Sequence, residues 1–192
     1  MENITGLVLA GGLSQRMKTD KALIKFKGKT LLENQLDLLK PIFNSVLISA
    51  NTNNYSFTNV EIIKDEQANI GPIGGIRSVL KNVETDYIFA ISVDMPMITA
   101  ELIKHLISQK ENYDIVMPVF NGKYEPTCAV YSKKCIKIID EQILAKDFKL
   151  GNLIKKSHTK IVEITKKSSL YKEQLFINLN NPENLNELSS VC

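Results

Sequence analysis

The stretch Ile4-Thr5-Gly6-Leu7-Val8-Leu9-Ala10-Gly11-Gly12 decides the fold class of this sequence. Residues Ile4–Ala10 form an apolar run with β-branched side chains, which predicts a buried strand. The glycine pair after it indicates a tight turn, because glycine adopts backbone conformations that other residues avoid. A strand buried on both faces is typical of a parallel sheet with helices on each side.

Short apolar runs and helix-like patterns alternate through the rest of the chain. Apolar spacing and capping residues predict helices at Leu31–Leu39, Ile76–Val83, Thr99 to about Gln109, Lys133–Ala145 and Asp147–Lys156. Short apolar runs predict further strands at Val46–Ala50, Val60–Ile63, Tyr87–Val93, Ile115–Met117, Ile161–Ile164 and Leu175–Leu179. Gly71–Gly75 is expected to be a loop, and Pro118–Tyr131 a loop and a strand. The alternation predicts an α/β fold whose mostly parallel sheet is covered on both faces.

Composition excludes several classes of protein. Of the 192 residues, 44% are hydrophobic and 23% are charged, which is typical of one globular domain and not of a disordered chain. A net charge of +3 gives no support to binding of nucleic acid or of a membrane surface. No apolar run approaches the ~20 residues of a membrane span. The three cysteines show no CxxC spacing, so we expect a cytoplasmic protein without a disulfide framework.

Polar residues follow the first four predicted strands. Ligands of open α/β sheets bind outside the carboxyl ends of the strands, so these residues share one edge if the strands are parallel. The first loop runs from Gly11 to Lys21, and the next three strands are followed by Asn51, Asp65 and Asp94. Carboxylates, an amide and cations at one edge suit a phosphate-bearing ligand with a metal ion.

The first loop carries the strongest of these signals. Gly11 and Gly12 allow backbone N–H groups to approach phosphate oxygens closely. Arg16 can bind two phosphate oxygens through its planar guanidinium, and Lys21 adds a point charge. The loop lacks both the GxGxxG dinucleotide fingerprint and a complete P-loop. The alternative is a glycine turn with solvated charges, but the spacing of Arg16 and Lys21 favours a functional loop.

Asp94 ends a buried strand and is followed two residues later by Pro96. A carboxylate at such a place suits Mg²⁺, which takes one or two carboxylates together with substrate phosphates. The alternative to a ligand-binding role, for Asp94 as for Asn51 and Asp65, is that the residue only stabilises a turn. Arg77 is the only arginine besides Arg16. It is a second candidate for ligand binding, and the alternative is that it is only a surface residue.

These residues resemble the nucleotide-binding signature of the molybdenum cofactor guanylyltransferases. The matching signature is Leu9-Ala10-Gly11-Gly12-x-Ser14-x-Arg16-Met17-x-x-Asp20-Lys21. Similar motifs continue along most of the chain: Gly71-Pro72-Ile73-Gly74-Gly75-Ile76, Asp94-x-Pro96, Tyr124-Glu125-Pro126 and Phe176-Ile177-Asn178-Leu179-Asn180-Asn181-Pro182-Glu183. The resemblance implies a Rossmann-like three-layer sandwich of the nucleotidyltransferase type. The Gly11-Gly12 pair resembles the GTP-using branch of the superfamily, whereas CTP-using relatives often carry Leu-Ala-Ala-Gly.

The resemblance implies Mg²⁺-dependent transfer of GMP from GTP to the molybdopterin cofactor, with release of pyrophosphate. It assigns contacts with GTP to Leu9, Ala10, Gly11, Gly12, Lys21, Asn51, Asp65 and Asp94. Asp94 would also bind Mg²⁺, and we expect Arg16, Lys21 and Asp94 to be the catalytic residues. Asn178 and Asn180, which alternate on one face of a predicted strand, are assigned to the molybdopterin, and their alternative is to cap and turn the chain into a last helix. Lys18 departs from the family pattern, which has glycine after Arg-Met.

We expect a single nucleotidyltransferase domain over residues 1–192, with a nucleotide-binding part at about 1–110 and an acceptor-binding part at about 111–192. Two alternative functions stay open. One is a related nucleotidyltransferase that uses CTP or a sugar-phosphate acceptor. The other is a non-catalytic nucleotide-binding protein that delivers the cofactor. The expected partners are GTP, the molybdopterin cofactor and cofactor-delivery proteins, with no nucleic acid and no membrane.

Overall fold

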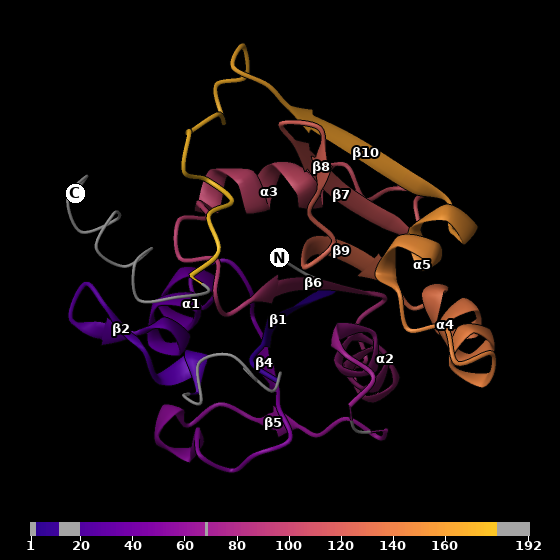
Figure 1. The fold of residues 1–192 in the computed structure, drawn as a ribbon, viewed down its shortest axis with the longest axis horizontal. Coiled ribbons are helices and arrows are strands. Elements are labelled where there is room, and N and C mark those ends of the chain that lie inside the picture. The colour runs from indigo at the N-terminus through magenta and orange to yellow at the C-terminus, as the bar shows by residue number, and fades with distance from the viewer. Residues whose placement is uncertain (1–2, 12–19, 68, 180–192) are drawn as a thin grey trace.

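A central sheet with helices on both faces forms the framework of the structure, which is a computed structural model (Figure 1). The structure describes residues 3–11, 20–67 and 69–179, and the eight strands of the sheet are counted within these ranges. They are β1 (Ile4–Leu9), β4 (Val46–Ser49), β5 (Ile62–Ile63), β6 (Tyr87–Ser92), β7 (Ile115–Phe120), β8 (Lys123–Tyr124), β9 (Cys128–Ser132) and β10 (Thr159–Ile164). A separate hairpin joins β2 (Lys25–Phe26) to β3 (Lys29–Thr30).

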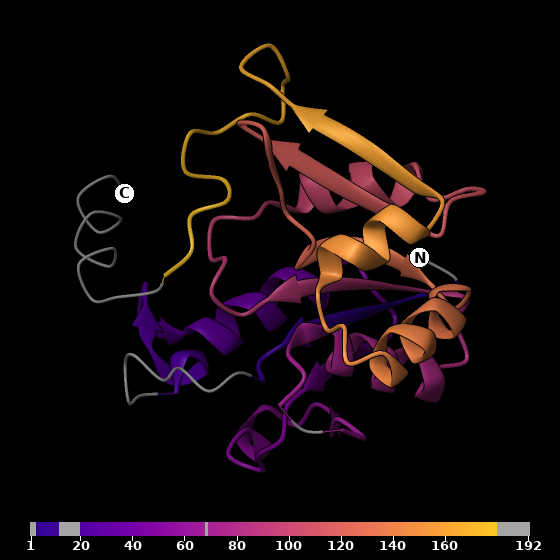
Figure 2. The same cartoon turned by 45° about the vertical axis from the view of Figure 1, so that its right-hand side comes forward.

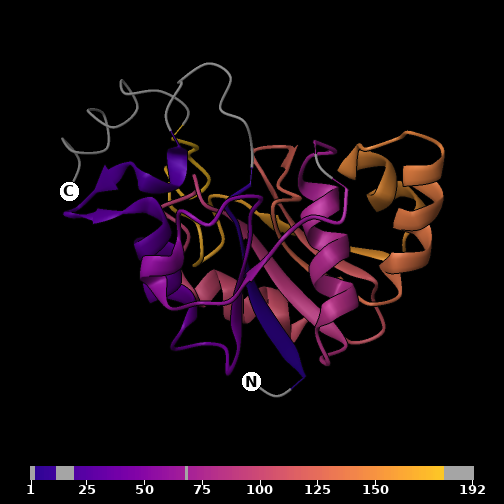
Figure 3. The same ribbon diagram turned by 90° about the horizontal axis from the view of Figure 1, so that it is seen from below.

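The sheet has the order β10-β7-β9-β6-β1-β4-β5, and β8 pairs with β7. Most neighbours are parallel, but β9 runs antiparallel to both β6 and β7. Leu9 at the end of β1 is in register with Ser49 on one side and Ser92 on the other. The strands β1, β4 and β6 therefore finish level with one another, at what we call the carboxyl edge. In Figure 3, β1 rises toward this edge from the N-terminal end at the bottom of the view.

Five α-helices in the described part of the chain cover the sheet: α1 (Leu31–Leu39), α2 (Pro72–Asn82), α3 (Ala100–Ser108), α4 (Cys135–Leu144) and α5 (Leu150–Lys156). Two short 3₁₀-helices are η1 (Lys21–Leu23) and η2 (Ser56–Thr58). Helices α1 and α3 bury their apolar side chains in a core on one face, and α2, α4 and α5 bury theirs on the other. Figure 2 brings α4 and α5 to the front of the sheet. The expected three-layer α/β sandwich with a mostly parallel sheet is therefore confirmed.

The start of α2 corrects one expectation from the sequence. Gly71–Gly75 was expected to be a loop, but the helix already begins at Pro72. Gly71 precedes it with a φ of 74°, a conformation that favours glycine. Proline fits the first turn of a helix, because the N–H that it lacks would have no partner there. Gly74 and Gly75 are thus buried helical residues and not part of a loop.

The expected strand at Leu175–Leu179 is wrong. Leu175 N donates to Lys172 O at 2.9 Å, and Ile177 N donates to Gln174 O at 3.0 Å, which are turn hydrogen bonds. Leu175, Phe176 and Leu179 are buried without joining the sheet, because they pack on the core that α1 and α3 share. Figure 2 shows the segment running from the end of β10 past α3 toward α1. The argument that placed Asn178 and Asn180 on one face of a strand therefore fails, and Asn180 lies outside the described residues.

Strand β7 is longer than expected, because it continues through Pro118 to Phe120. Strand β9 pairs with β7 only at Ile115 and Val116, so the missing N–H of Pro118 interrupts no ladder with β9. Beyond that point β8 pairs with Val119 and Phe120 of β7.

No helix in the described ranges has both the length and the apolar character needed to cross a membrane.

Candidate active site

Lys21 and Asp94 form an ion pair at the carboxyl edge. Lys21 Nζ lies 3.0 Å from Asp94 Oδ2, and the Asp94 side chain is 15% exposed. Asp94 follows β6, whereas Lys21 begins η1 after the first loop, so the pair joins residues 73 positions apart in the sequence. The structure therefore brings together two of the residues expected to handle phosphate and metal.

Neighbouring groups hold Asp94 in place. Ser92 Oγ donates to Asp94 Oδ1 at 2.6 Å, so each carboxylate oxygen has a hydrogen-bond partner. The main chain of the turn is held as well, because Asp94 O accepts from Leu179 N at 2.9 Å and Met95 O accepts from the Gln35 side chain of α1 at 2.7 Å. The bond to Leu179 brings Asn178 next to the Asp94 turn, although Asn178 is not on a strand.

A second polar cluster lies at the ends of β4 and β5. The Asp65 carboxylate accepts from Ser49 Oγ at 3.0 Å and from Asn51 Nδ2 at 3.2 Å. Asp65 N in turn donates to Asn51 Oδ1 at 3.0 Å, so Asn51 and Asp65 bond to each other twice. Burial raises the pKa of Asp65 above its usual range, and the two side-chain hydrogen bonds partly oppose this effect. The arrangement presents an amide and a half-buried carboxylate, which can accept hydrogen bonds from a nucleoside.

The end of β1 lies between the two clusters. Leu9 O accepts from Val93 N at 3.1 Å, and Ala10 N donates to Ser49 O at 3.0 Å. Leu9 and Ala10 are buried, whereas Gly11 is exposed. Of the other residues expected at the site, Gly12, Arg16, Lys18 and Asn180 lie outside the described residues.

The absence of a side chain at Gly75 keeps the second cluster intact. A Cβ atom there would lie 2.2 Å from Ser49 Oγ and 3.1 Å from Ser49 Cβ. We expect Gly75→Ala to displace the Ser49 hydroxyl from Asp65 and to lower the free energy of unfolding by about 1–3 kcal/mol, as overpacked cores do. Urea unfolding, followed by circular dichroism, measures this change.

Gly151 of α5 provides the matched control, because a Cβ added there meets no atom within 4 Å. Gly151→Ala is expected to raise the free energy of unfolding by about 0.5 kcal/mol through the lower entropy of the unfolded chain. Equal stability of the two alanine variants would contradict the close contact between α2 and Ser49.

Arg77 forms ion pairs with Glu66, which follows β5, and with Asp140 of α4. Lys81 Nζ adds a contact of 3.3 Å with Glu66. Ser78 Oγ also accepts from Glu66 N at 3.0 Å, so α2 holds the residue after Asp65 by both its main chain and its side chain. Arg77 is therefore an anchor between elements on one face of the sheet, and its pairing with two carboxylates favours this structural role over substrate binding.

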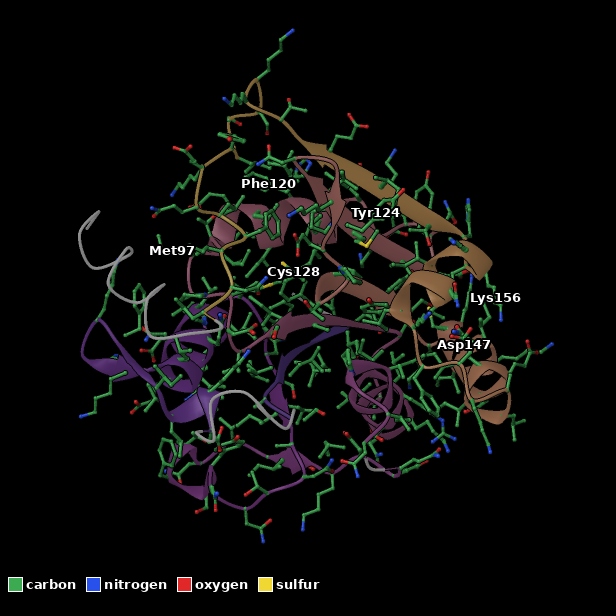
Figure 4. The ribbon with its side chains drawn as sticks, viewed as in Figure 1. Met97, Phe120, Tyr124, Cys128, Asp147 and Lys156 are labelled. Carbon is green, nitrogen blue, oxygen red and sulfur yellow. The ribbon has the colours of Figure 1, made fainter. Side chains whose placement is uncertain are left out.

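Glu125 lies on the loop between β8 and β9, which borders the Asp94 turn. Thr127 O on this loop accepts from Ser92 N at 2.8 Å. Figure 4 shows Tyr124 and Cys128, which flank the loop, and Phe120, whose ring packs against Phe176. Burial raises the pKa of the half-buried Glu125 carboxyl above its usual range. The loop, through Thr127, and the segment after β10, through Leu179, thus both bond to the main chain at Ser92 and Asp94.

Three further residues at the edge escaped the sequence argument: Ser49, Tyr55 and Ser92. Tyr55 OH donates toward Asp20, whose Oδ1 and Oδ2 lie 2.9 and 2.8 Å away. Ser92 had a usable signal, since a serine two positions before an aspartate often bonds to its carboxylate. Tyr55 and Ser49 had none, because their partners lie 35 and 16 residues away along the chain.

Comparisons with known proteins agree with this geometry. The family model described as the MobA-like NTP transferase domain matches residues 6–161. A protein of Natranaerobius thermophilus named "Probable molybdenum cofactor guanylyltransferase" is 35% identical, over 97% of this chain and 95% of the relative. The resemblance found in the sequence motifs is thereby confirmed.

Solved structures share the fold. The molybdopterin-guanine dinucleotide biosynthesis protein A of Archaeoglobus fulgidus has a TM-score of 0.84 at 23% identity, and the alignment covers 98% of each chain. The 4-diphosphocytidyl-2C-methyl-D-erythritol synthase of Anaerococcus prevotii has a TM-score of 0.74 at 14% identity, over 98% of this chain and 95% of that one. Proteins with different names thus share the sheet order and layers, and the fold alone does not decide the substrate.

The family model spans most of the sheet, from β1 into β10, and includes the described residues of both polar clusters. The relative from N. thermophilus matches this chain from end to end at an identity above 30%. This chain therefore belongs to the MobA-like NTP transferase family and is a nucleotidyltransferase.

Proposed function

We propose that this enzyme transfers GMP from GTP to the molybdopterin cofactor, forming the guanine dinucleotide cofactor and pyrophosphate. The observation that carries the proposal is the Lys21–Asp94 pair at 3.0 Å, at the carboxyl edge where β1 leads into the exposed Gly11. The name of the relative from N. thermophilus supports the choice of GTP and of the acceptor.

In the proposed reaction, the terminal phosphate of the acceptor attacks the α-phosphorus of GTP. A bond forms between an acceptor oxygen and this phosphorus, and the bond to the bridging β-phosphate oxygen breaks, so pyrophosphate leaves with the electron pair. A phosphate monoester is an anion at neutral pH, so no strong general base is required. Catalysis then rests on positioning and on charge stabilisation, with Arg16 and Lys21 steadying the departing pyrophosphate.

The chemistry of Asp94 fits a divalent cation. Its carboxylate accepts two hydrogen bonds, and an ionised carboxylate offers about four lone-pair sites, so it keeps room for a metal ion. Mg²⁺ takes one or two carboxylates and binds substrate phosphates as well, so this carboxylate suits the ion. A bound Mg²⁺ would neutralise charge on the phosphates.

The remaining residues divide between the two substrates in this proposal. Asn51 and Asp65 hydrogen-bond the nucleoside, and the main chain of Leu9–Gly12 contacts the phosphates. Asn178 and Asn180 contact the molybdopterin, because the bond from Leu179 N to Asp94 O holds this segment against the reaction centre. The nucleotide part would span about residues 1–110 and the acceptor part about residues 111–192 of one domain. Delivery proteins that accept the product, and a cytoplasmic location, are part of the same proposal.

Pyrophosphate release tests the proposal. Purified enzyme is incubated with Mg²⁺, the molybdopterin cofactor and GTP, CTP or UTP in turn. We expect GTP to give a kcat/KM at least about a hundredfold above CTP, because a site that hydrogen-bonds a base rejects one with unmatched groups. Release that depends on both GTP and the acceptor supports the proposal.

The same assay separates the alternatives. Preference for CTP, or release only with a sugar phosphate, would identify a related nucleotidyltransferase with other substrates. Tight GTP binding by calorimetry without pyrophosphate release for any acceptor would identify a non-catalytic delivery protein.

A further inference from the structure

Tyr55 contacts Ala10 at the end of β1 and Asp20 just before η1. Its side chain is 1% exposed and belongs to the core that α1 and α3 share. The hydroxyl oxygen lies 2.8 and 2.9 Å from the two carboxylate oxygens of Asp20, and 3.3 Å from Ala10 O. One buried hydroxyl thus touches the residue after β1 and the residue before η1.

The hydroxyl stays protonated and acts as a donor. Burial, together with the hydrogen bond to Asp20, raises the pKa of Tyr55 well above its usual range. A hydroxyl has a single proton, so Asp20, with the shorter distances, receives the main hydrogen bond and Ala10 the weaker contact.

Asp20 connects the Tyr55 hydroxyl to the turn that carries Lys21. Its Oδ1 accepts from Ala22 N at 3.1 Å, which makes Asp20 the N-cap of η1. Lys21 is the first residue of η1, and its Nζ reaches Asp94. A chain of contacts therefore runs from the buried Tyr55 hydroxyl through the Asp20 carboxylate to the turn that aims Lys21.

We propose that Tyr55 is a positioning residue for Lys21, and that its hydroxyl sets the affinity of the enzyme for the β- and γ-phosphates of a nucleoside triphosphate. The inference rests on the proposed function, which gives Lys21 a role at the departing pyrophosphate. Without the hydroxyl, the Asp20 carboxylate keeps only the bond from Ala22 N and is less firmly held, so nucleotide binding must supply part of the free energy that orders Lys21.

Tyr55→Phe tests the inference, because it removes only the hydroxyl and keeps the ring in the core. Calorimetry is used to measure the Kd of GTP and of GMP for each variant. We expect Tyr55→Phe to weaken GTP binding about tenfold, the effect of losing a hydrogen bond to a charged group. GMP binding stays within twofold of wild type, because GMP lacks the phosphates assigned to Lys21. The KM of the acceptor is unchanged.

Tyr131→Phe is the matched control. Tyr131 is also buried, and its hydroxyl donates to Pro126 O at 2.6 Å rather than to Asp20. We expect this variant to leave the Kd of both nucleotides unchanged, so that loss of a buried tyrosine hydroxyl as such is excluded as the cause. Asp20→Ala and the double variant complete a cycle, in which Tyr55→Phe weakens GTP binding less than twofold once Asp20 is gone.

The outcomes distinguish failure of the inference about Tyr55 from failure of the proposed function. If wild-type enzyme binds no GTP, the proposed function fails. If it binds GTP and Tyr55→Phe binds GTP equally well, the inference about Tyr55 is wrong while the proposed function stands. Equal weakening of GTP and GMP, with a lower thermal midpoint, would show a merely structural role and would also overturn the inference.

Discussion

Asp94→Ala is expected to lower kcat/KM for GMP transfer about a thousandfold, because it removes the carboxylate that suits the divalent cation. The fold should persist. The main-chain bond from Leu179 N to Asp94 O does not involve the lost side chain, and Met95 O stays bonded to Gln35. Steady-state pyrophosphate release at saturating Mg²⁺ measures the rate, and thermal unfolding checks the fold.

The ion pair between Lys29 and Asp37 provides a matched control for this experiment. It joins an exposed lysine and an exposed aspartate at 2.5 Å, on the β2–β3 hairpin and α1. Asp37→Ala therefore removes a similar carboxylate–ammonium contact outside the candidate site and should leave turnover unchanged. Wild-type rates in Asp94→Ala would remove Asp94 from the mechanism.

Lys21→Ala is the second variant with a large expected effect. It deletes the ammonium that would pair with the phosphates, and we expect kcat to fall about a hundredfold. The Kd of GTP should rise as well, and this effect should shrink at high salt because ionic screening weakens the lost interaction. Transfer rates and GTP calorimetry at two ionic strengths provide the measurements.

Lys29→Ala is the control for Lys21→Ala, since it removes the lysine of the exposed pair with Asp37. It should match wild type in both rate and GTP affinity. An unchanged kcat in Lys21→Ala would mean that the ion pair with Asp94 serves only to neutralise the carboxylate. Asp94 would then remain the only described member of the proposed catalytic set.

The carboxyl edge was predictable because local patterns determine most of it. An apolar run ending in glycine indicates a buried strand and its turn, and parallel strands put the residues that follow them at one edge. These patterns alone predicted that Asn51, Asp65 and Asp94 lie at the same edge. The register of β1 with β4 and β6 brings the ends of these strands level.

Other features depend on contacts between distant residues. Burial of Leu175, Phe176 and Leu179 looks like a strand in the sequence, but the same burial is reached by turns that pack on the core. The position of Tyr55 within hydrogen-bond distance of Asp20 follows from how the segment after β4 packs against the end of β1 and the start of η1. The spacing of residues along the chain predicts neither the turns at 175–179 nor the contact of Tyr55 with Asp20. Both features depend on which surfaces the folded core leaves uncovered.

The antiparallel strand β9 joins the two parts of the chain that we propose to bind the nucleotide and the acceptor. It comes after residue 110 in the chain, yet it lies between β6 and β7 and pairs with β6 from Tyr87 to Ile91. A polypeptide cut near residue 110 would leave the edge of β6 open, with unpaired backbone groups facing solvent. The nucleotide half is thus not a detachable module. An acceptor that distorts β9 would also distort β6, because β6 pairs with β9. Strand β6 ends at Ser92, close to Asp94.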